Sequence, residues 1–343
     1  MNIKSLLLGS AAALAVVSGA QAADAIVAAE PEPMEYVRVC DAFGTGYFYI
    51  PGTETCLKLS GYVRTQLDFR GDDYETDGVE SGFRSNSRAY LEFTAKNDSE
   101  LGQIESYIAL EADSRDDRGS DDQGGAFLDT ALIKVGGLTV GYFYNYWDTG
   151  IAGETDDLGS NLNDAIQYTY TTDAFNVSAM VENLDTAAGS YTDEDSVGIS
   201  GQVGATFGVA SIEVVGSYDF GAEESAYRAI VSAEIGPGTL QVAGIYSTGE
   251  SAYWSASEWA VAASYAAKIT DKLTLTPGFQ YWGTRGVDVS GDYTGSDDAW
   301  KAGLTVDYKI AEGLTTKISA QYESDDLDGS EGFGGFFRLQ RSF

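Results

Sequence analysis

The chain has 343 residues, 43% of them hydrophobic and 12% aromatic, and its 53 acidic and 20 basic side chains give a net charge of −33 at pH 7. A charge this negative repels phosphate backbones and argues against a nucleic-acid partner. The absence of histidine removes Ser-His-Asp and Cys-His catalysis and histidine-built zinc sites, and beyond residue 23 no apolar run nears the ~20 residues of a membrane-spanning helix.

Residues 1–22 are predicted to be a secretory signal peptide. Lys4 supplies a positive charge, Leu6 to Val17 form a short apolar stretch, and Ala20-Gln21-Ala22 is a cleavage site of the A-x-A type. An anchoring helix is the alternative interpretation, but the apolar stretch is too short for it and ends among small residues. We therefore exclude this segment from the fold and expect an exported protein.

Residues 23–55 are predicted to form an N-terminal periplasmic segment that ends in a disulfide loop. The two cysteines are Cys40 and Cys56, and an isolated pair in an exported protein favours one disulfide. For an enclosed loop of about 15 residues, chain entropy predicts a stabilisation of ~3 kcal/mol. A metal site is disfavoured because two cysteines without histidine do not complete a tetrahedral shell. A pair of free thiols is the remaining alternative.

From Cys56 to Phe343 one pattern repeats, in which roughly ten residues alternate between apolar and polar side chains before a turn follows. Such alternation places two sets of side chains on the two faces of a strand. Leu304, for example, lies on an apolar face and Thr305 on a polar one, so arginine is expected to be tolerated at position 305 and not at 304. The predicted strands are 56–69, 85–96, 101–113, 126–135, 138–144, 164–172, 175–184, 195–207, 209–220, 226–235, 239–248, 258–269, 273–284, 298–310, 314–324 and 334–343.

Two features favour a transmembrane barrel over a soluble β-sandwich. Charged residues lie in mid-strand on the polar face, as on the wall of a water-filled lumen. Aromatic residues gather near predicted strand ends, where they suit the membrane interfaces. They are Tyr142, Tyr144, Tyr146, Trp147, Trp254, Trp259, Tyr281 and Trp282. We predict that residues 56–343 form an all-β, 16-stranded antiparallel barrel in a bacterial outer membrane, with short periplasmic turns and long outer loops.

The predicted long loops carry much of the acidity. They lie near 70–84, 114–125, 145–163, 185–194, 221–225, 249–257, 285–297 and 325–333. The densest acid clusters are Asp72 to Glu80, Asp116 to Asp122 and Asp325 to Glu331. A solvated acidic surface is the plain interpretation. The functional alternative is that Ca²⁺ or Mg²⁺ bridges these carboxylates to lipopolysaccharide phosphates, since both ions prefer oxygen ligands. No cofactor and no metal held by the protein alone is expected.

The opening of the predicted barrel carries a family resemblance. The segment from Val39 to Arg64, VCDAFGTGYFYIPGTETCLKLSGYVR, resembles the opening of the alphaproteobacterial general porins. Together with the signal peptide, the strand pattern and the terminal Phe343, this resemblance covers essentially the whole chain. It implies a homotrimer of 16-stranded barrels, an aromatic C-terminal signal for the barrel-assembly machinery, and a third long loop folded into the lumen. Arg341 departs from the terminal pattern, in which an apolar or aromatic residue faces lipid.

The resemblance also implies a constriction in which acids of the third loop face bases on the wall. The strand end Gly141 to Asp148 leads into this loop, which is expected to reach about Asn163. Its acids are Asp148, Glu154, Asp156 and Asp157. Lumen-facing parity indicates Arg64, Arg88 and Arg338 as the opposing bases, followed by Lys58 and Lys317. For each base, an ion pair that only holds the wall in shape is the alternative role.

The expected function is a passive aqueous channel for small hydrophilic solutes and ions, and not an enzyme. A field between loop acids and wall bases would order water and disfavour apolar solutes, and the lining charge would produce a mild cation preference. A substrate-specific channel, for instance for sugars, is the alternative within the same fold, and a ladder of lumen aromatics would mark it. A non-conducting structural or adhesin barrel is a second alternative. A membrane-embedded hydrolase is disfavoured because histidine is absent.

Overall fold

The computed structural model describes residues 38–71, 82–114, 125–184, 196–327 and 329–343. The predicted signal peptide and the acid clusters at 72–80 and 116–122 lie outside these residues. Val39–Phe343 form one compact unit. Among the residues that the structure describes, no helix is long and apolar enough to cross a membrane.

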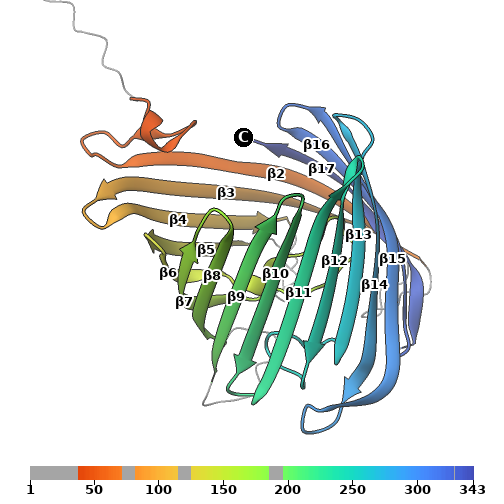
Figure 1. Cartoon of the computed structure of the whole chain (residues 1–343). Helices are drawn as coiled ribbons and strands as arrows, with labels where there is room; N and C mark the ends of the chain where they lie inside the picture. Colours follow the sequence, from red (N-terminus) through yellow and green to blue (C-terminus); the bar gives the residue numbers. More distant parts are fainter. Residues whose placement is uncertain (1–37, 72–81, 115–124, 185–195, 328) are drawn as a thin grey trace, which may run out of the picture. The chain divides into compact units, whose positions relative to one another are not determined.

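Sixteen antiparallel strands close into a ring. Strands β2 to β17 pair in sequence order, and β17 pairs with β2 (Figure 1). The two-residue β1 is added at the start of β2. The bounds are β1 Phe48–Tyr49, β2 Cys56–Arg70, β3 Phe83–Ser99, β4 Gly102–Asp113, β5 Ala126–Val135, β6 Leu138–Tyr144, β7 Leu162–Thr171, β8 Phe175–Asn183, β9 Val197–Phe207, β10 Ala210–Asp219, β11 Glu224–Ile235, β12 Gly238–Ser247, β13 Trp259–Lys268, β14 Leu273–Val287, β15 Tyr293–Ala311, β16 Leu314–Asp325 and β17 Ser330–Ser342, with short 3₁₀ helices η2 Asp41–Phe43 and η3 Tyr146–Asp148.

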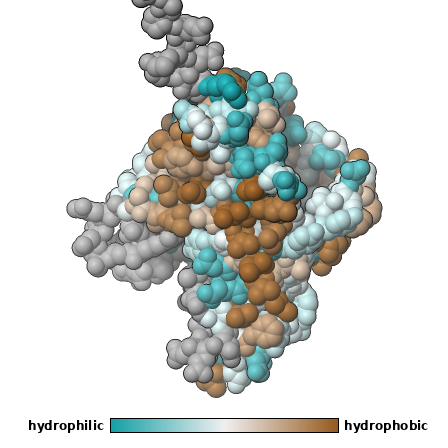
Figure 2. All heavy atoms as spheres, turned by 90° about the vertical axis from the view of Figure 1, so that its left-hand side faces the viewer, coloured by the Kyte–Doolittle hydropathy of each residue, from teal (hydrophilic) through white to brown (hydrophobic). Residues whose placement is uncertain are grey.

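The alternation of the sequence becomes the two faces of this wall. Apolar residues such as Val203, Val261 and Leu304 point outward and are 49%, 45% and 43% exposed, whereas the neighbouring Thr305 points inward and is fully buried. On the face drawn in Figure 2 apolar residues gather in a strip through the middle of the surface, with hydrophilic residues on either side. An apolar outer band around a polar interior is the arrangement that a lipid bilayer requires of a barrel. The predicted fold is therefore confirmed.

Two of the connections predicted as long loops, 285–297 and 325–333, are less than half as long as expected, because the flanking strands continue beyond the apolar pattern. β14 runs to Val287 and β15 already begins at Tyr293, with Arg285 paired to Asp297 across two register shifts. The connection after β16 spans 326–329, because β17 already begins at Ser330. Backbone pairing, and not alternating hydropathy, extends these hairpins, so hydropathy alone could not locate their ends.

The aromatic residues divide between two environments, which corrects the prediction that all of them lie at the membrane interfaces. Trp259 packs on Tyr281 with ring centroids 5.3 Å apart, and Trp300 packs on Tyr322 at 5.5 Å. These rings belong to adjacent strands on the outward face, as interfacial residues should. In contrast, Tyr146, Trp147 and Trp254 are at most 7% exposed and belong to an interior cluster. The alternation rule fails for them because they lie in loops, where a period of two has no meaning.

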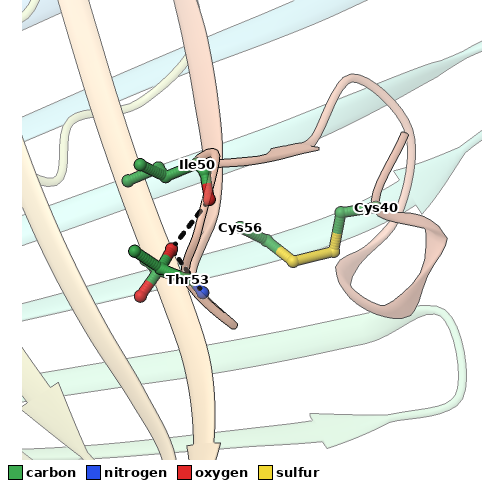
Figure 3. The surroundings of a disulfide bond; sticks show 5 residues. Cys40, Ile50, Thr53 and Cys56 are labelled. Carbon is green, nitrogen blue, oxygen red and sulfur yellow. Dashed lines mark hydrogen bonds between the residues drawn. A yellow bond between two sulfur atoms is a disulfide. The ribbon is translucent and has the colours of Figure 1, made fainter. Parts of the chain in front are cut away.

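The Cys40–Cys56 disulfide links the N-terminal segment to the first residue of β2, which confirms the predicted pairing (Figure 3). Both cysteines are at most 1% exposed, with Tyr47 packed beside them. The enclosed loop turns at Pro51-Gly52, where Gly52 has φ 81° and the amide and hydroxyl of Thr53 both donate to the Ile50 carbonyl at 3.0 Å. Proline followed by a residue with positive φ is the signature of a type II turn. The alternative of two free thiols is therefore wrong.

The C-terminal strand keeps a regular register in spite of Arg341. This residue pairs with Leu314 on one side and Val63 on the other, so it occupies an outward position. Its guanidinium donates to the carbonyl of Gly313 at 3.2 Å, in the turn between β15 and β16. A long basic side chain at the end of a strand can reach polar groups at the rim in this way. Phe343 extends the pairing, since its amide donates to Gly61 at 3.0 Å.

Candidate pore constriction

The connection between β6 and β7, residues 145–161 and called the third loop here, folds back onto the inner wall of the barrel. Asn145 starts it by accepting a hydrogen bond from the amide of Trp147 at 3.0 Å, which caps η3. Its side-chain amide donates to Glu182 on β8 at 2.8 Å. Trp147 is fully buried and Leu158 is 3% exposed. The inward fold of this loop is therefore confirmed.

The tip of the third loop is bound to the opposite part of the wall. Gln280 on β14 accepts from the amide of Asp157 at 2.5 Å and donates to its carbonyl at 2.6 Å. Gln321 on β16 donates to the carbonyl of Glu154 at 2.5 Å. On β14 itself, Gly278 makes room for Thr155, since a Cβ at position 278 would lie 2.8 Å from the Thr155 Cβ. Gln280, Gln321 and Gly278 thus form the surface of the wall that the tip of the third loop contacts.

Glu154 is the loop acid that the structure brings into contact with the predicted bases. Its carboxylate lies 2.5 Å from the ammonium of Lys317 and 3.6 Å from the guanidinium of Arg338. Lys317 also lies 3.6 Å from Asp307. Lys317 and Arg338 are cross-strand neighbours on β16 and β17. Acid and base are therefore in direct contact, where the sequence led us to expect that they face each other across open space.

The other three predicted loop acids have separate surroundings. Asp148 is exposed and accepts a hydrogen bond from the Ser160 hydroxyl at 2.7 Å. Asp157 is exposed as well, and its carboxylate accepts from the amide of Gly159 at 3.4 Å. Asp156 turns inward within the loop and accepts from the amide of Ile151 at 3.0 Å. Burial raises the pKa of Asp156, and the neighbouring charge of Asp157 raises it further.

The remaining predicted bases lie at different places on the wall. Arg64 lies 4.7 Å above the ring of Tyr62 and donates to Gln340 at 3.0 Å. Arg88, its cross-strand partner on β3, is bound to Glu111 at 2.8 Å and Asp113 at 3.0 Å. Its contacts are those of a base that holds the wall in shape. Lys58 lies near the disulfide segment instead, because a Cβ at Gly46 would be 3.8 Å from its side chain.

Sequence reasoning missed Arg228, which is the most buried base among the residues that the structure describes. It lies on β11, is 2% exposed, and donates to the carbonyls of Tyr146 at 2.5 Å and Trp147 at 2.6 Å. A signal was present in the sequence, since Arg228 is the only lysine or arginine between Lys134 and Lys268. Its position also matches lumen-facing parity.

The connection between β12 and β13, residues 248–258 and called the sixth loop here, folds inward as well, although it was predicted to be an outer loop. Tyr253 and Trp254 are 1% and 3% exposed. Trp254 stacks near Trp147 with ring centroids 6.5 Å apart, and the Tyr253 hydroxyl donates to Glu182 at 3.0 Å. Burial raises the pKa of Tyr253. Two loops therefore share one packed interior.

A ring of sixteen strands with an apolar outer band, a charged inner face and an inward-folded loop defines an outer-membrane channel of the porin class. A family model described as "Porin subfamily" matches residues 24–333. The chain belongs to this family and is a porin of the bacterial outer membrane.

Curated relatives agree with this assignment over 93% or more of their length. The chain is 47% identical to the putative outer membrane protein y4fJ of Sinorhizobium fredii, covering 100% of this chain and 99% of the relative. It is 44% identical to outer membrane protein IIIA of Rhizobium leguminosarum bv. viciae, with 98% and 93% covered. It is 34% identical to porin Omp2b of Brucella canis, with both chains fully covered.

Solved structures share the fold at low sequence identity. The outer-membrane channel DcaP of Acinetobacter baumannii superposes with a TM-score of 0.69 at 14% identity, covering 86% of this chain and 99% of that one. OmpT of Vibrio cholerae in its trimer form gives 0.59 at 15% identity, with 85% and 100% covered.

Proposed function

We propose that the third loop and the wall of β2 to β5 enclose the narrowest part of a passive diffusion pathway. The observation that carries this proposal is the seating of Glu154 against Lys317 and Arg338. The third loop is hydrogen-bonded to β8, to β10 through β12, to β14 and to β16. The inner face of β2 to β5 therefore borders the space left for solutes.

The charges along this pathway favour small cations. Glu154 is compensated by its two basic neighbours, so Asp148 and Asp157 are the exposed loop acids that act on a passing ion. On the facing wall Arg64 supplies positive charge, while Arg88 is compensated by Glu111 and Asp113. Because exposed charges act over only ~8 Å at physiological ionic strength, groups at the constriction matter more than distant loops. We propose a mild cation preference that weakens as salt rises.

Reversal potentials in planar bilayers under a salt gradient test this assignment. The double variant Asp148→Asn/Asp157→Asn should shift the reversal potential toward that of a less cation-selective pore. Asp325→Asn/Asp326→Asn is the matched control, since it removes two acids at the outer end of β16. Equal shifts from the two double variants, or an anion-selective wild type, would exclude the third loop as the selectivity element.

A sugar-specific channel is the less favoured function. Tyr62, Tyr90 and Tyr107 occupy inward positions on β2, β3 and β4 and form the patch that such a channel would use. However, Tyr62 is stacked on Tyr90 at 5.1 Å and carries the Arg64 guanidinium at 4.7 Å. The hydroxyls of Tyr90 and Tyr107 donate to Asp129 and Glu92. These rings are held by neighbours, which supports a structural role.

We also propose that the barrel assembles as a homotrimer and is inserted through recognition of Phe343 by the barrel-assembly machinery. The trimer form of Vibrio cholerae OmpT, which shares the fold, supports the first part. The exposed Phe343 ring, at 57%, supports the second. Chemical cross-linking of the native protein should give a trimer. Deletion of Phe343 should lower the yield of folded barrel, whereas Ser342→Ala should not.

Divalent cations are proposed to join the acidic outer loops to lipopolysaccharide. The clusters at 72–80 and 116–122 lie outside the described residues, and Asp325 and Asp326 lie at the end of β16 and just beyond it. Carboxylate oxygens are suitable ligands for Ca²⁺ and Mg²⁺. Chelation with EDTA should release lipopolysaccharide from the purified protein, and neutralising the three clusters should abolish this effect. Lipopolysaccharide that stays bound after chelation would contradict the proposal.

A further inference from the structure

Arg228 is isolated in the sequence and fully enclosed in the structure. The stretch from 135 to 267 contains no other lysine or arginine. Its side chain has no exposed surface, while that of Glu213, its carboxylate partner at 3.2 Å, is 24% exposed. A buried guanidinium loses its hydration and persists only where hydrogen bonds replace the lost water. The partners of Arg228 therefore indicate what it is for.

Those partners belong to both limbs of the third loop. One terminal nitrogen, Nη2, donates to the carbonyl of Tyr146 at 2.5 Å, and Nη1 donates to that of Trp147 at 2.6 Å, where the loop enters. Nη1 also donates to the carbonyl of Leu158 at 3.3 Å, where the loop returns. A single side chain on β11 thus binds the entering and the returning limb at once.

The ring of Trp147, beside Arg228, helps to hold the entering limb of the third loop. The guanidinium carbon lies 5.2 Å from the ring of Trp147, a distance at which cations attract aromatic faces. The indole nitrogen of Trp147 in turn donates to Ser217 on β10 at 2.9 Å. The entering limb is therefore held by its backbone and by its side chain, on two adjacent strands.

We propose that Arg228 is a positioning residue that joins the two limbs of the third loop to β11 and thereby fixes the opening of the constriction. The inference rests on the proposed role of this loop in the pore. Gln280, Gln321 and Lys317 place the tip of the loop, and Arg228 places its root. Lysine cannot replace it, since an ammonium is a point charge without the planar fork that reaches carbonyls on two sides.

Three variants test this role. Arg228→Gln removes the fork and the charge, and Arg228→Lys keeps the charge without the fork. Lys309→Gln is the control, because the carboxylate partner of Lys309, Glu312 at 2.7 Å, lies in the turn after β15 and is 94% exposed. Heat-dependent mobility in gels reports whether the barrel folds, and single-channel recordings report the state of the constriction.

We expect all three variants to fold as heat-modifiable barrels. Arg228→Gln should then show at least several-fold more open-channel noise and closure at lower voltage, and Arg228→Lys should give an intermediate result. Lys309→Gln should remain as quiet as the wild type. Quiet, wild-type-like channels in both Arg228 variants would overturn the proposal.

If Arg228→Gln folds poorly, the conservative variant Arg228→Lys carries the test, and a cross-link at the tip of the third loop adds a second measurement. A Cβ at Gly153 would lie 3.7 Å from the Cβ of Thr276 on β14, within the range that a disulfide spans. Gly153 has φ 100°, so Gly153→Cys alone is needed as a control for backbone strain. Under oxidising conditions Gly153→Cys/Thr276→Cys should suppress the noise of Arg228→Gln, and reduction should restore it.

The outcomes separate the inference from the proposed function. If the Asp148→Asn/Asp157→Asn pair shifts selectivity while Arg228 variants stay quiet, the constriction stands and Arg228 does not position it. If Arg228 variants fluctuate but no loop acid affects selectivity, the loop is held by Arg228 without being the selectivity element. Noise that persists in the cross-linked Arg228→Gln channel would place its origin outside the third loop and overturn the proposal.

Discussion

The carboxylate of Glu154, at the tip of the third loop, lies 2.5 Å from the ammonium group of Lys317 on β16. Arg338 on β17 adds a second positive charge at 3.6 Å. These three groups form one compensated cluster that ties the loop to the wall. Removing a single member therefore changes both the attachment of the loop and the charge that a permeating ion meets.

Lys317→Gln should make the pore more cation-selective, because it leaves Glu154 with the more distant Arg338 alone. The measured shift in reversal potential should shrink between 0.1 M and 1 M salt, as the Debye length falls from about 10 Å to about 3 Å. Lys309→Gln is the matched control, since its partner Glu312 is 94% exposed in the turn that follows β15. Equal shifts in the two variants would contradict a location of Lys317 at the constriction.

Arginine substitutions on the two faces of β15 should have different effects on the barrel. Leu304→Arg places a charge on the lipid-facing side and is expected to cost about 2–4 kcal/mol in the stability of the inserted barrel. Thr305 points inward but is fully buried beneath the third loop, where a Cβ at Gly153 would lie 3.6 Å from its hydroxyl. Thr305→Arg should therefore displace the loop and raise current noise, which revises the expectation of tolerance.

The matched inward control is Thr315→Arg on β16, whose side chain is exposed opposite Lys309. This variant should fold and conduct like the wild type. The yield of heat-modifiable barrel and single-channel recordings check the three substitutions together. A poorly folding Thr315→Arg, or a quiet Thr305→Arg channel, would show that the inner surface is not arranged as described.

Loss of the disulfide should loosen the N-terminal segment while the barrel stays intact. Cys40→Ser/Cys56→Ser removes a link between residues 16 apart in sequence. The chain-entropy model gives about 3 kcal/mol for the stabilisation that such a link provides. Limited proteolysis should cleave between 41 and 55 many times faster in the double variant. Heat-dependent gel mobility should change little, because β2 is paired with β3 from Cys56 to Phe69 and with β17 from Tyr62 to Arg70. A barrel that fails to fold would contradict this division.

The charge of Asp156 should make the stability of the third loop depend on pH. Burial raises the pKa of Asp156 above the usual aspartate value of about 3.9. The folded protein therefore keeps this proton at a pH where the unfolded chain has lost it. The contribution of Asp156 to the free energy of unfolding is thus most favourable at low pH and declines as pH rises through the raised pKa.

Asp156→Asn should accordingly gain thermal stability relative to the wild type as pH rises from 3 to 7. The variant removes the charge and keeps an oxygen that can accept from the Ile151 amide. Transition temperatures of both proteins in detergent, measured at several pH values, give the difference. A difference that stays constant or grows toward low pH would contradict the prediction.

Trp254→Ala should disturb the pore without removing the barrel. The ring is 3% exposed and packs near Trp147, with the indole nitrogen donating to Ser257 at 2.6 Å. Loss of a buried tryptophan typically costs about 3–5 kcal/mol, and here the loss falls on the third and sixth loops. We expect larger and noisier conductance steps. Trp259→Ala, on the lipid-facing side and 38% exposed, should leave conductance nearly unchanged.

Local sequence pattern was enough to place the strands and their faces. The predicted ranges 126–135 and 138–144 coincide with β5 and β6, and the assignment of Leu304 and Thr305 to opposite faces is confirmed. Alternation succeeds because successive side chains of a strand point to opposite sides whatever lies around them. It failed at β15, which begins five residues early through pairing of residues such as Asp297 with Arg285.

Parity determined which bases point inward, but only the tertiary structure decided what each one touches. Arg88 and Lys317 carry the same sequence signal, yet one binds carboxylates of β4 and the other binds the third loop. The inward fold of the sixth loop depends on Trp147 and Trp254. The attachment of the two limbs of the third loop to β11 depends on Arg228. These contacts join residues more than sixty positions apart, and no periodic pattern along the chain records which distant side chains will meet once the ring has closed.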